Sequence, residues 1–434
     1  MAFTFVDLFA GIGGFHYVMD ALGGECVFAS EIDEQAAAVY SRNWGVEPAG
    51  DIVALTDPEV LVPRHDVLCA GFPCQPFSKS GFQRGVAETR GTLFWNICRI
   101  LEERRPPVIV LENVRNLAGP RHRSTWETII RSLRNLGYWV ADEPAVFSPH
   151  FLPPTMGGTP QVRDRVFIIG FQTQGRPFPS EFDPPRVQRA PVEGWDVQAW
   201  DVERDLPLEP DSSIPDLAAY RLTAEEEGWI NVWDDLLARL DCATLPGFPI
   251  WGDDLCVEPR IEAGMPQWKR GFLMKNAAFY VANRGVIEPW LRRHDGLREL
   301  PPSRRKLEWQ AQDTERSLRN CLLHFRPSGI RAKKPTYVPA LVAINQTSIY
   351  GPRARRLTPR ETARLQGLPD TFDFGSQPDS VTYRQLGNGV AAGAVRYVFV
   401  NAVRHAVAAG VIDAAQWGSV LAEAPDAMRV PLAA

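Results

Sequence analysis

A cysteine framed by prolines is the residue of this sequence best placed to do chemistry. Cys74 lies in Gly71-Phe-Pro-Cys-Gln-Pro-Phe-Ser78, directly after the apolar run of residues 67–70. The run predicts a buried strand, and the glycine and prolines that follow predict a loop. Open α/β sheets place catalytic groups past the carboxyl ends of their strands. We therefore interpret Cys74 as a nucleophile; the alternative is a small buried hydrophobic residue, the usual role of a free cysteine.

Two further short stretches could supply partners for this thiol. Glu112-Asn-Val114 follows the apolar run of residues 108–111, where a carboxylate could serve as an acid or as a hydrogen-bonding partner for a ring nitrogen. Arg163 and Arg165 alternate in Gln161-Val-Arg-Asp-Arg165, so on an extended chain they share one face and could orient a carboxylate or bind phosphate. A surface glutamate and a solvated strand entrance are the alternatives.

A third constellation predicts a nucleoside pocket. The turn at residues 10–14 is rich in glycine, which lets a ligand approach the backbone closely. The third glycine of a dinucleotide-binding fingerprint is replaced by His16, which disfavours a pyrophosphate site. Glu31 follows at the end of the second expected strand, where a carboxylate can accept both ribose hydroxyls, and Asp51 could read an exocyclic amine. A structural turn with two solvated acids is the alternative.

The elements that must position these residues alternate along the chain. Apolar runs predict strands at residues 3–9, 26–29, 67–70, 108–111 and 165–171, and helical spacing predicts helices at 15–22, 34–44, 92–104 and 124–136. This alternation predicts an α/β fold with a doubly wound, mostly parallel sheet and helices on both faces. Ser124 is expected to cap the last of these helices, with Glu127 completing a capping box. A later helical run through residue 407 should pack back on the same sheet.

Bulk properties separate the chain into parts of opposite charge. The 434 residues carry a net charge of −5, yet residues 181–258 hold 19 Asp/Glu against 5 Lys/Arg, and residues 260–361 hold 21 Lys/Arg against 8 Asp/Glu. A basic segment interleaved with aromatic residues suits a phosphate backbone and unstacked bases. The strand–helix rhythm stops after residue 171, so we expect a smaller second domain at residues 175–384, between a first domain at 1–174 and a returning helix at 385–434.

Other classes are disfavoured. No apolar run approaches the roughly 20 residues that a membrane span needs. The seven cysteines are scattered and odd in number, which argues against a disulfide framework and suggests a reducing cytoplasm. We expect no metal site, because no Cys/His pairs at zinc spacing lie close together.

The ordered motifs resemble those of the C5-cytosine DNA methyltransferases. The matching blocks are Phe9-Ala-Gly-Ile-Gly-Gly14, Glu31, Gly50-Asp51, Gly71-Phe-Pro-Cys-Gln-Pro-Phe-Ser78, Gly91-Thr-Leu-Phe94, Glu112-Asn-Val114, Gln161-Val-Arg-Asp-Arg165, Arg356-Leu-Thr-Pro-Arg-Glu361, Arg364-Leu-Gln-Gly-Leu-Pro369 and Gly387-Asn-Gly-Val390. They lie near both ends of the chain and leave residues 172–350 as the variable target-recognition region of that family.

The resemblance implies a mechanism and a set of site residues. A cytosine is flipped out of duplex DNA, Cys74 attacks its C6 atom, Glu112 holds or protonates N3, and C5 takes the methyl group of S-adenosylmethionine. The implied catalytic residues are Cys74, Glu112, Arg163 and Arg165. The implied cofactor residues are Phe9, Gly11, Ile12, Gly13, Glu31, Ile32, Asp51, Ile52, Leu93, Asn388 and Val390. The implied DNA contacts are Gln75, Ser78, Gln83, Arg84, Arg331, Lys333 and Lys334.

The resemblance also implies a biological setting and leaves alternatives. We expect a monomer that acts on duplex DNA as the modification enzyme of a bacterial restriction-modification system. The alternatives are a methyltransferase for tRNA cytosine, a catalytically silent DNA-binding protein, and transfer of another group from a modified cofactor. The target sequence cannot be read from the chain, because specificity rests on a few side chains without a recognisable code.

Overall fold

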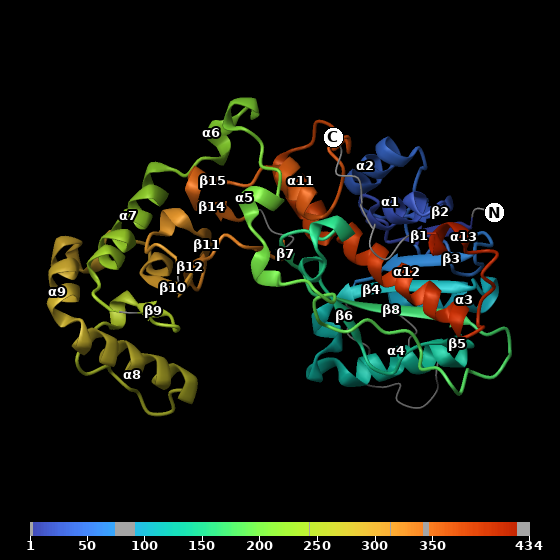
Figure 1. The fold of residues 1–434 in the computed structure, drawn as a ribbon, viewed down its shortest axis with the longest axis horizontal. Coiled ribbons are helices and arrows are strands. Elements are labelled where there is room, and N and C mark those ends of the chain that lie inside the picture. Colours follow the sequence, from blue (N-terminus) through green and yellow to red (C-terminus); the bar gives the residue numbers. More distant parts are fainter. Residues whose placement is uncertain (1–2, 74–91, 243, 313, 342–346, 423–434) are drawn as a thin grey trace. The chain divides into compact units, whose positions relative to one another are not determined.

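The computed structural model describes residues 3–73, 92–242, 244–312, 314–341 and 347–422 (Figure 1). The chain forms two compact units. The first contains residues 1–200, 339–345 and 359–434, and the second contains residues 201–338 and 346–358. The expected functional domains, with boundaries at residues 174 and 384, stay a prediction, because compactness alone does not say which residues recognise a target.

The first unit is built on a seven-stranded sheet. Its strands are β1 (Thr4–Leu8), β2 (Glu25–Ser30), β3 (Val67–Gly71), β4 (Val108–Val114), β5 (Tyr138–Trp139), β6 (Ala145–Phe147) and β8 (Arg165–Gln172). The order is β2-β1-β3-β4-β8-β5, with β6 also paired to β8. The first four strands in this order run parallel, and β8 is antiparallel to β4. The predicted doubly wound, mostly parallel sheet is confirmed.

Helices cover both faces of this sheet, as Figure 1 shows for α12 and α4. One face packs on α1 (Gly14–Ala21), α12 (Ala392–Ala408) and α13 (Gly418–Leu421), and the other packs on α3 (Leu93–Arg104) and α4 (Arg123–Asn135). The alternation of side chains explains the two cores, since Cys69 of β3 enters the first and its neighbours Leu68 and Ala70 enter the second. The late helical run of the sequence forms α12, whose apolar side chains belong to the core on the first of these faces.

A smaller cluster connects the two ends of the chain within this unit. α2 (Glu34–Trp44), α10 (Pro359–Leu365) and α11 (Asp379–Asn388) meet around a core that includes Val39, Leu368 and Leu386. Two short strands, β7 (Gln161–Val162) and β13 (Val338–Pro339), form a separate two-stranded sheet.

The second unit combines a six-stranded sheet with helices. Its strands, in spatial order, are β15 (Arg355–Arg356), β14 (Ile349–Tyr350), β11 (Leu322–Arg326), β12 (Gly329–Lys333), β10 (Lys306–Gln310) and β9 (Ile250–Trp251). Its helices are α5 (Val202–Asp205), α6 (Leu217–Tyr220), α7 (Ala224–Arg239), α8 (Gln267–Ala282) and α9 (Arg284–Arg293). One face of the sheet and the helices α7, α8 and α9 share a single core.

The oppositely charged segments neutralise each other inside this unit. Arg355 pairs with Asp211 at 2.9 Å, and Arg293 pairs with Asp235 at 2.7 Å. Three further pairs, Arg353–Glu203, Arg356–Glu226 and Arg319–Glu227, follow the same pattern. Many arginines of the basic segment therefore stabilise the fold of this unit through ion pairs. Fewer of its cationic side chains remain to bind a polyanion.

One local expectation is wrong. α4 begins at Arg123 after His122, and no side chain caps it. Glu127, expected in a capping box with Ser124, instead lies 3.0 Å from Arg123 in an i,i+4 ion pair. The capping box of this chain lies at α7, where Thr223 and Glu226 exchange hydrogen bonds with each other's backbone N–H groups.

No helix in the described parts of the chain is long and apolar enough to cross a membrane. Within the same parts, no group of three or more His, Cys, Asp or Glu side chains could hold a metal ion.

Candidate active site

A cavity of about 450 Å³ lies at the carboxyl ends of β1, β2, β3 and β4 in the first unit. Its described lining consists of Phe9, Ala10, Gly11, Ile12, Gly14, Phe15, Ser30, Glu31, Ile32, Asp33, Ala36, Gly50, Asp51, Ile52, Gly71, Phe72, Pro73, Leu93, Glu112, Asn113, Val114, Arg165, Arg384, Gln385, Gly387, Asn388, Gly389 and Val390. These residues come from both ends of the chain, so the sheet edge and α11 build the cavity together.

The sequence-predicted cofactor residues lie around this cavity, with one exception. Gly13 does not line it, because it lies under the indole ring of Trp44. A Cβ atom at Gly13 would come within 2.0 Å of Trp44 Nε1, and that nitrogen donates to the carbonyl of Ile12 at 3.1 Å. The missing side chain of Gly13 therefore leaves room for the Trp44 ring to pack against the turn. The positive φ of Gly13, 91°, also favours glycine at this position.

Glu31 fixes the turn that follows β1. Its Oε2 accepts from the backbone N–H of Gly11 at 2.7 Å, and its Oε1 accepts from the N–H of Asp33 at 2.8 Å. A carboxylate oxygen has two lone pairs, so both oxygens can accept a further hydrogen bond from a ligand. Gly11 has a φ of 56°, and a Cβ there would meet no atom within 4 Å, so the turn leaves open space above it.

His16, which replaces the third glycine of a dinucleotide site, is a core residue. It is buried, its Nδ1 lies 2.7 Å from the hydroxyl of Tyr40, and its ring stacks on Trp44 with centroids 4.6 Å apart. Burial lowers the pKa of His16 to about 4, so the ring is neutral at pH 7. Near the start of α1, His16 therefore packs with the aromatic rings of Tyr40 and Trp44.

A buried ion pair forms one wall of the cavity. Glu112 lies near the end of β4, Arg165 opens β8, and Arg165 Nε is 2.8 Å from Glu112 Oε1. The side chain of Glu112 is 8% exposed. Burial raises the pKa of Glu112 above its usual value, against the opposing effects of Arg165 and Arg163. The carboxyl group can therefore carry a proton nearer to neutral pH than an exposed glutamate.

Asn113 holds the chain as it leaves β3. Its side-chain amide donates to the carbonyl of Phe72 at 2.7 Å, and this hydrogen bond is buried. The next residue is Pro73, which lines the cavity, and Cys74 follows. Cys74 and the four expected DNA contacts at Gln75, Ser78, Gln83 and Arg84 lie outside the described residues.

Arg163 is placed differently from Arg165. It is fully buried, and its guanidinium donates to the carbonyls of Leu341 at 3.0 Å and of Gly387 at 2.8 Å, and to the carbonyl of Gly389. Its backbone N–H donates to Ser148 Oγ at 2.8 Å. The described contacts therefore tie the segment that carries Asn388 and Val390 to the rest of the cavity.

Replacing Arg163 with alanine is expected to destabilise the first unit by about 3 kcal/mol or more, because three buried carbonyls lose their donor. The urea midpoint of the first unit's unfolding measures this loss. Arg115→Ala is the matched control, since Arg115 is 58% exposed and its partner Asp164 keeps Arg189; it should cost about 1 kcal/mol at most. Equal midpoints for the two variants would contradict the prediction.

Sequence reasoning missed Arg384 at the mouth of the cavity. Its Nη2 lies 3.3 Å from Oδ2 of Asp33 and 3.1 Å from Oε1 of Gln35. The sequence gives no signal for this contact, because Arg384 and Asp33 are about 350 residues apart. A single arginine in an amphipathic helix is usually interpreted as a solvent-exposed residue.

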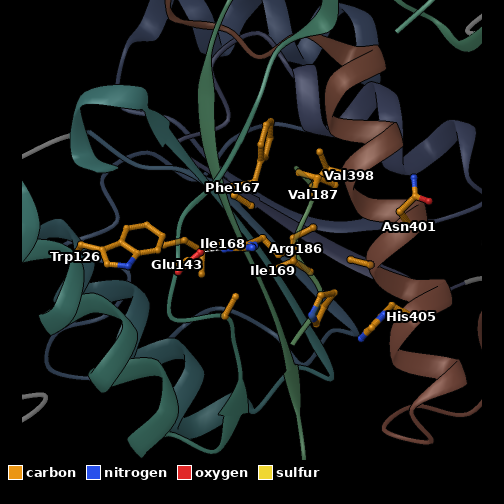
Figure 2. Close-up of a pocket in the computed structure, with 14 residues that line it drawn as sticks. Trp126, Glu143, Phe167, Ile168, Ile169, Arg186, Val187, Val398, Asn401 and His405 are labelled. Carbon is orange, nitrogen blue, oxygen red and sulfur yellow. Dashed lines mark hydrogen bonds and ion pairs between the residues drawn. The ribbon is translucent and has the colours of Figure 1, made fainter. Parts of the chain in front are cut away.

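A second cavity of about 230 Å³ shares no residue with the first. Figure 2 shows Phe167, Ile168 and Ile169 of β8 facing it, with Asn401 and His405 of α12 on the other side. The polar groups there already have partners: His405 Nε2 lies 2.7 Å from the carbonyl of Asp183, and Arg186 pairs with Glu143. The lining also includes Trp126 of α4, so this cavity lies among the sheet, α4 and α12.

The remaining expected DNA contacts belong to the second unit. Arg331 and Lys333 lie on β12, and Lys334 follows that strand. Lys333 Nζ lies 4.6 Å from the ring centroid of Tyr337.

Comparisons with known proteins show the family of this chain. A family model described as "C-5 cytosine-specific DNA methylase" matches residues 3–234 and 266–404. Type II methyltransferase M.AluI of Cellulosimicrobium cellulans is 44% identical over 511 aligned positions, which cover 98% of this chain and 97% of that protein. Type II methyltransferase M.HgiCI of Herpetosiphon aurantiacus is 30% identical over 442 positions, covering 93% and 98%.

Among solved structures, a crystal structure of the S. pombe Dnmt2 methyltransferase has 17% sequence identity and a TM-score of 0.47, over 93% of this chain and 98% of that one.

Proposed function

Since this chain belongs to the C-5 cytosine-specific DNA methylase family and is a DNA cytosine-5 methyltransferase, we propose that methyl transfer takes place in the cavity at the carboxyl edge of its first sheet. One observation carries the proposal: the buried pair of Glu112 and Arg165 forms a wall of the same cavity into which the chain before Cys74 leads. A thiol, a carboxyl group of raised pKa and a guanidinium are the groups that attack on a cytosine ring requires.

The same cavity fits S-adenosylmethionine. Glu31 keeps lone pairs for the ribose hydroxyls, and Ile32, whose side chain is exposed, offers an apolar surface to the adenine. Asp51 accepts from the N–H of Val53 through Oδ1 at 2.9 Å, and among the described residues nothing donates to its Oδ2, which suits an exocyclic amine. When bound, S-adenosylmethionine supplies a methyl group on a sulfonium that leaves as a neutral thioether.

The residues of this chain divide the work on the cytosine. The Cys74 thiolate forms a bond to C6 while Glu112 gives its proton to N3, so the electrons of the C5–C6 double bond become available at C5. C5 takes the methyl group. Loss of the C5 proton to a base then restores the double bond and expels the thiolate, and the N3 proton returns to Glu112. Arg165 holds Glu112 in place and faces the carbonyl oxygen of the base.

The cytosine can reach these groups only outside the base stack, so the enzyme must flip it from the duplex. We assign target recognition to the second unit, whose sheet carries Arg331 and Lys333. The relatives named above are type II methyltransferases, which supports a modification role beside a restriction endonuclease.

The direct test is product analysis. Purified enzyme is incubated with methyl-labelled S-adenosylmethionine and either duplex DNA or tRNA, and the nucleosides are identified by mass spectrometry. We expect 5-methyldeoxycytidine from DNA and no labelled nucleoside from tRNA. Label on the exocyclic N4 atom of cytosine, or in tRNA, would overturn the assignment. Bisulfite sequencing of DNA from an expressing host then gives the target sequence.

DNA binding is expected to weaken as salt rises. Each phosphate contact contributes about −0.9 to the slope of log K against log salt, so six to ten contacts lower affinity about 10³- to 10⁵-fold between roughly 50 and 200 mM salt. Fluorescence anisotropy with a labelled duplex measures the slope, and S-adenosylmethionine binding, measured by calorimetry, is the control that should change little. A flat line for DNA would show that the basic segment makes no phosphate contacts.

A further inference from the structure

The second unit carries a basic surface whose described cations do not pair with the acidic segment. Along β10, β11 and β12, alternate side chains such as Trp309, Phe325 and Ile330 enter the core under the helices. The intervening side chains lie on the opposite face. They include Glu308, His324, Arg326, Arg331 and Lys333, which we call the basic sheet face.

Strand register brings these side chains together. Glu308 of β10 is the partner of Arg331 of β12 across the parallel pair, and His324 of β11 is the partner of Arg331 across the antiparallel pair. Arg331 is therefore the centre of the group, with a neighbour on each adjacent strand.

Glu308 holds two arginines at once. Its Oε2 accepts from Arg331 Nε at 2.9 Å and from Arg326 Nη2 at 2.8 Å. Its Oε1 accepts from the side-chain amide of Gln310. Among the described residues, Arg331 makes no hydrogen bond through its two terminal nitrogens, and 29% of its side chain is exposed. The guanidinium is thus fixed at Nε and keeps its outer fork for a ligand.

The charge of this face is unbalanced. Within the described chain, Glu308 is the one carboxylate that pairs with Arg326 or Arg331, and no carboxylate pairs with Lys333. Burial and the neighbouring Arg331 lower the pKa of Lys333, and burial with three cationic neighbours lowers the pKa of His324 to about 4. Elsewhere in the unit, arginines such as Arg355 and Arg293 are matched by acids. A ligand that offers acceptor atoms would relieve this repulsion.

A guanidinium fork held at Nε matches the O6 and N7 acceptors of guanine in the major groove, whereas a lysine acts as a point charge. We propose that Glu308 orients Arg331 to read one guanine of the target sequence. Arg326 and Lys333 bind the DNA next to this guanine. The inference rests on the proposed function, because it requires duplex DNA as the substrate. Arg331 is then a specificity-determining residue, and Glu308 is a positioning residue that acts through it.

The experiment compares duplexes that carry the wild-type target with duplexes changed at one base pair at a time. Both the dissociation constant and kcat/KM are measured for the wild type, Arg331→Ala, Arg331→Lys and Glu308→Gln. We expect Arg331→Ala to lose discrimination at a single G·C pair by roughly 5- to 150-fold, with the other pairs unaffected. Arg331→Lys keeps the charge but not the planar fork, so it should lose part of the same discrimination and retain the salt slope. Glu308→Gln should show a partial loss at the same pair.

Arg293→Ala is the matched control, since Arg293 is an exposed arginine of the same unit whose partner Asp235 keeps Arg239 and His294. It should leave discrimination unchanged at every pair, and thermal unfolding checks that all variants fold.

An equal loss of affinity for all duplexes in Arg331→Ala, with a salt slope smaller by about 1, would identify a phosphate contact and overturn the reading role. Unchanged discrimination would overturn it as well. Wild-type enzyme that binds its target selectively without methylating it would instead contradict the proposed function, and the binding series would still decide the role of Arg331.

Discussion

Cys74→Ala is expected to reduce methyl transfer to DNA below detection while S-adenosylmethionine still binds. The physical reason is that C5 of cytosine becomes nucleophilic only after a thiolate has added to C6, and among the described residues no thiol lines the cavity. Cys69 and Cys98 are buried thiols whose pKa values are raised by burial, so they stay protonated. Transfer of labelled methyl groups and calorimetry with the cofactor measure the two effects.

The control for this prediction is Cys256→Ala, because Cys256 lies half-buried in the second unit and in none of the described sites. It should transfer methyl groups at the wild-type rate. A duplex with 5-fluorocytosine at the target provides a second readout, because the fluorine at C5 blocks the elimination that releases the enzyme. Wild type should form a covalent complex that survives denaturation, and Cys74→Ala should form none. Methylation by Cys74→Ala at the wild-type rate would remove Cys74 from the mechanism.

Glu112→Gln is expected to lower kcat by about 10²- to 10⁴-fold, the usual contribution of a positioned acid. The amide can still accept from Arg165, but it has no proton to give to N3. Cofactor affinity should change little, since Glu31 and Asp51 make the proposed cofactor contacts. Single-turnover kinetics measure the chemical step, and Glu102→Gln, an exposed glutamate on α3, is the control that keeps wild-type activity.

The pH profile gives the same prediction a second measurement. In the proposed mechanism Glu112 acts as an acid, so activity is expected to fall as pH rises through its pKa. Burial raises that pKa, which moves the fall toward neutral pH. The alkaline fall should disappear in Glu112→Gln, which has no carboxyl group to lose a proton. An unchanged alkaline fall in the variant would show that another group controls it.

Much of the fold and of the site could be predicted because both depend on short-range patterns. The alternation in β3 places Leu68 and Cys69 in different cores, as the apolar run predicts. Glu31 follows β2 directly and Glu112 lies near the end of β4, and strands that run parallel bring their carboxyl ends to one edge. The residues around the cavity could therefore be named from local sequence, together with the family resemblance.

The rest could not be predicted because it depends on contacts between distant parts of the chain. Arg163 and Arg165 alternate in sequence, yet Arg163 donates to the carbonyls of Leu341 and Gly387 while Arg165 pairs with Glu112. The capping box expected at Ser124 does not form because α4 already begins at Arg123, which puts Ser124 inside the helix, and Glu127 pairs with Arg123. A helix cap and an i,i+4 ion pair each contribute about 1 kcal/mol or less, so local sequence preferences do not show which of the two contacts forms.

The charge segments show the same limit on a larger scale. A net of opposite sign in two stretches indicates a polyanion site and an acidic surface, and the structure shows that acids of the first stretch neutralise arginines of the second. Charge counting in sequence cannot tell an arginine that holds the fold from one that meets DNA.

The contacts of Arg163 have a consequence for how the enzyme is made. The turn at Gly11 and the segment from Gly387 to Val390 both line the cavity, and Arg163 is one of the groups that join this late segment to the early sheet. In a chain still being synthesised these contacts cannot form before residue 390 has left the ribosome, so we expect the ability to bind S-adenosylmethionine only after that point. Fragments divided in the second unit should for the same reason be inactive separately and regain activity when they are co-expressed.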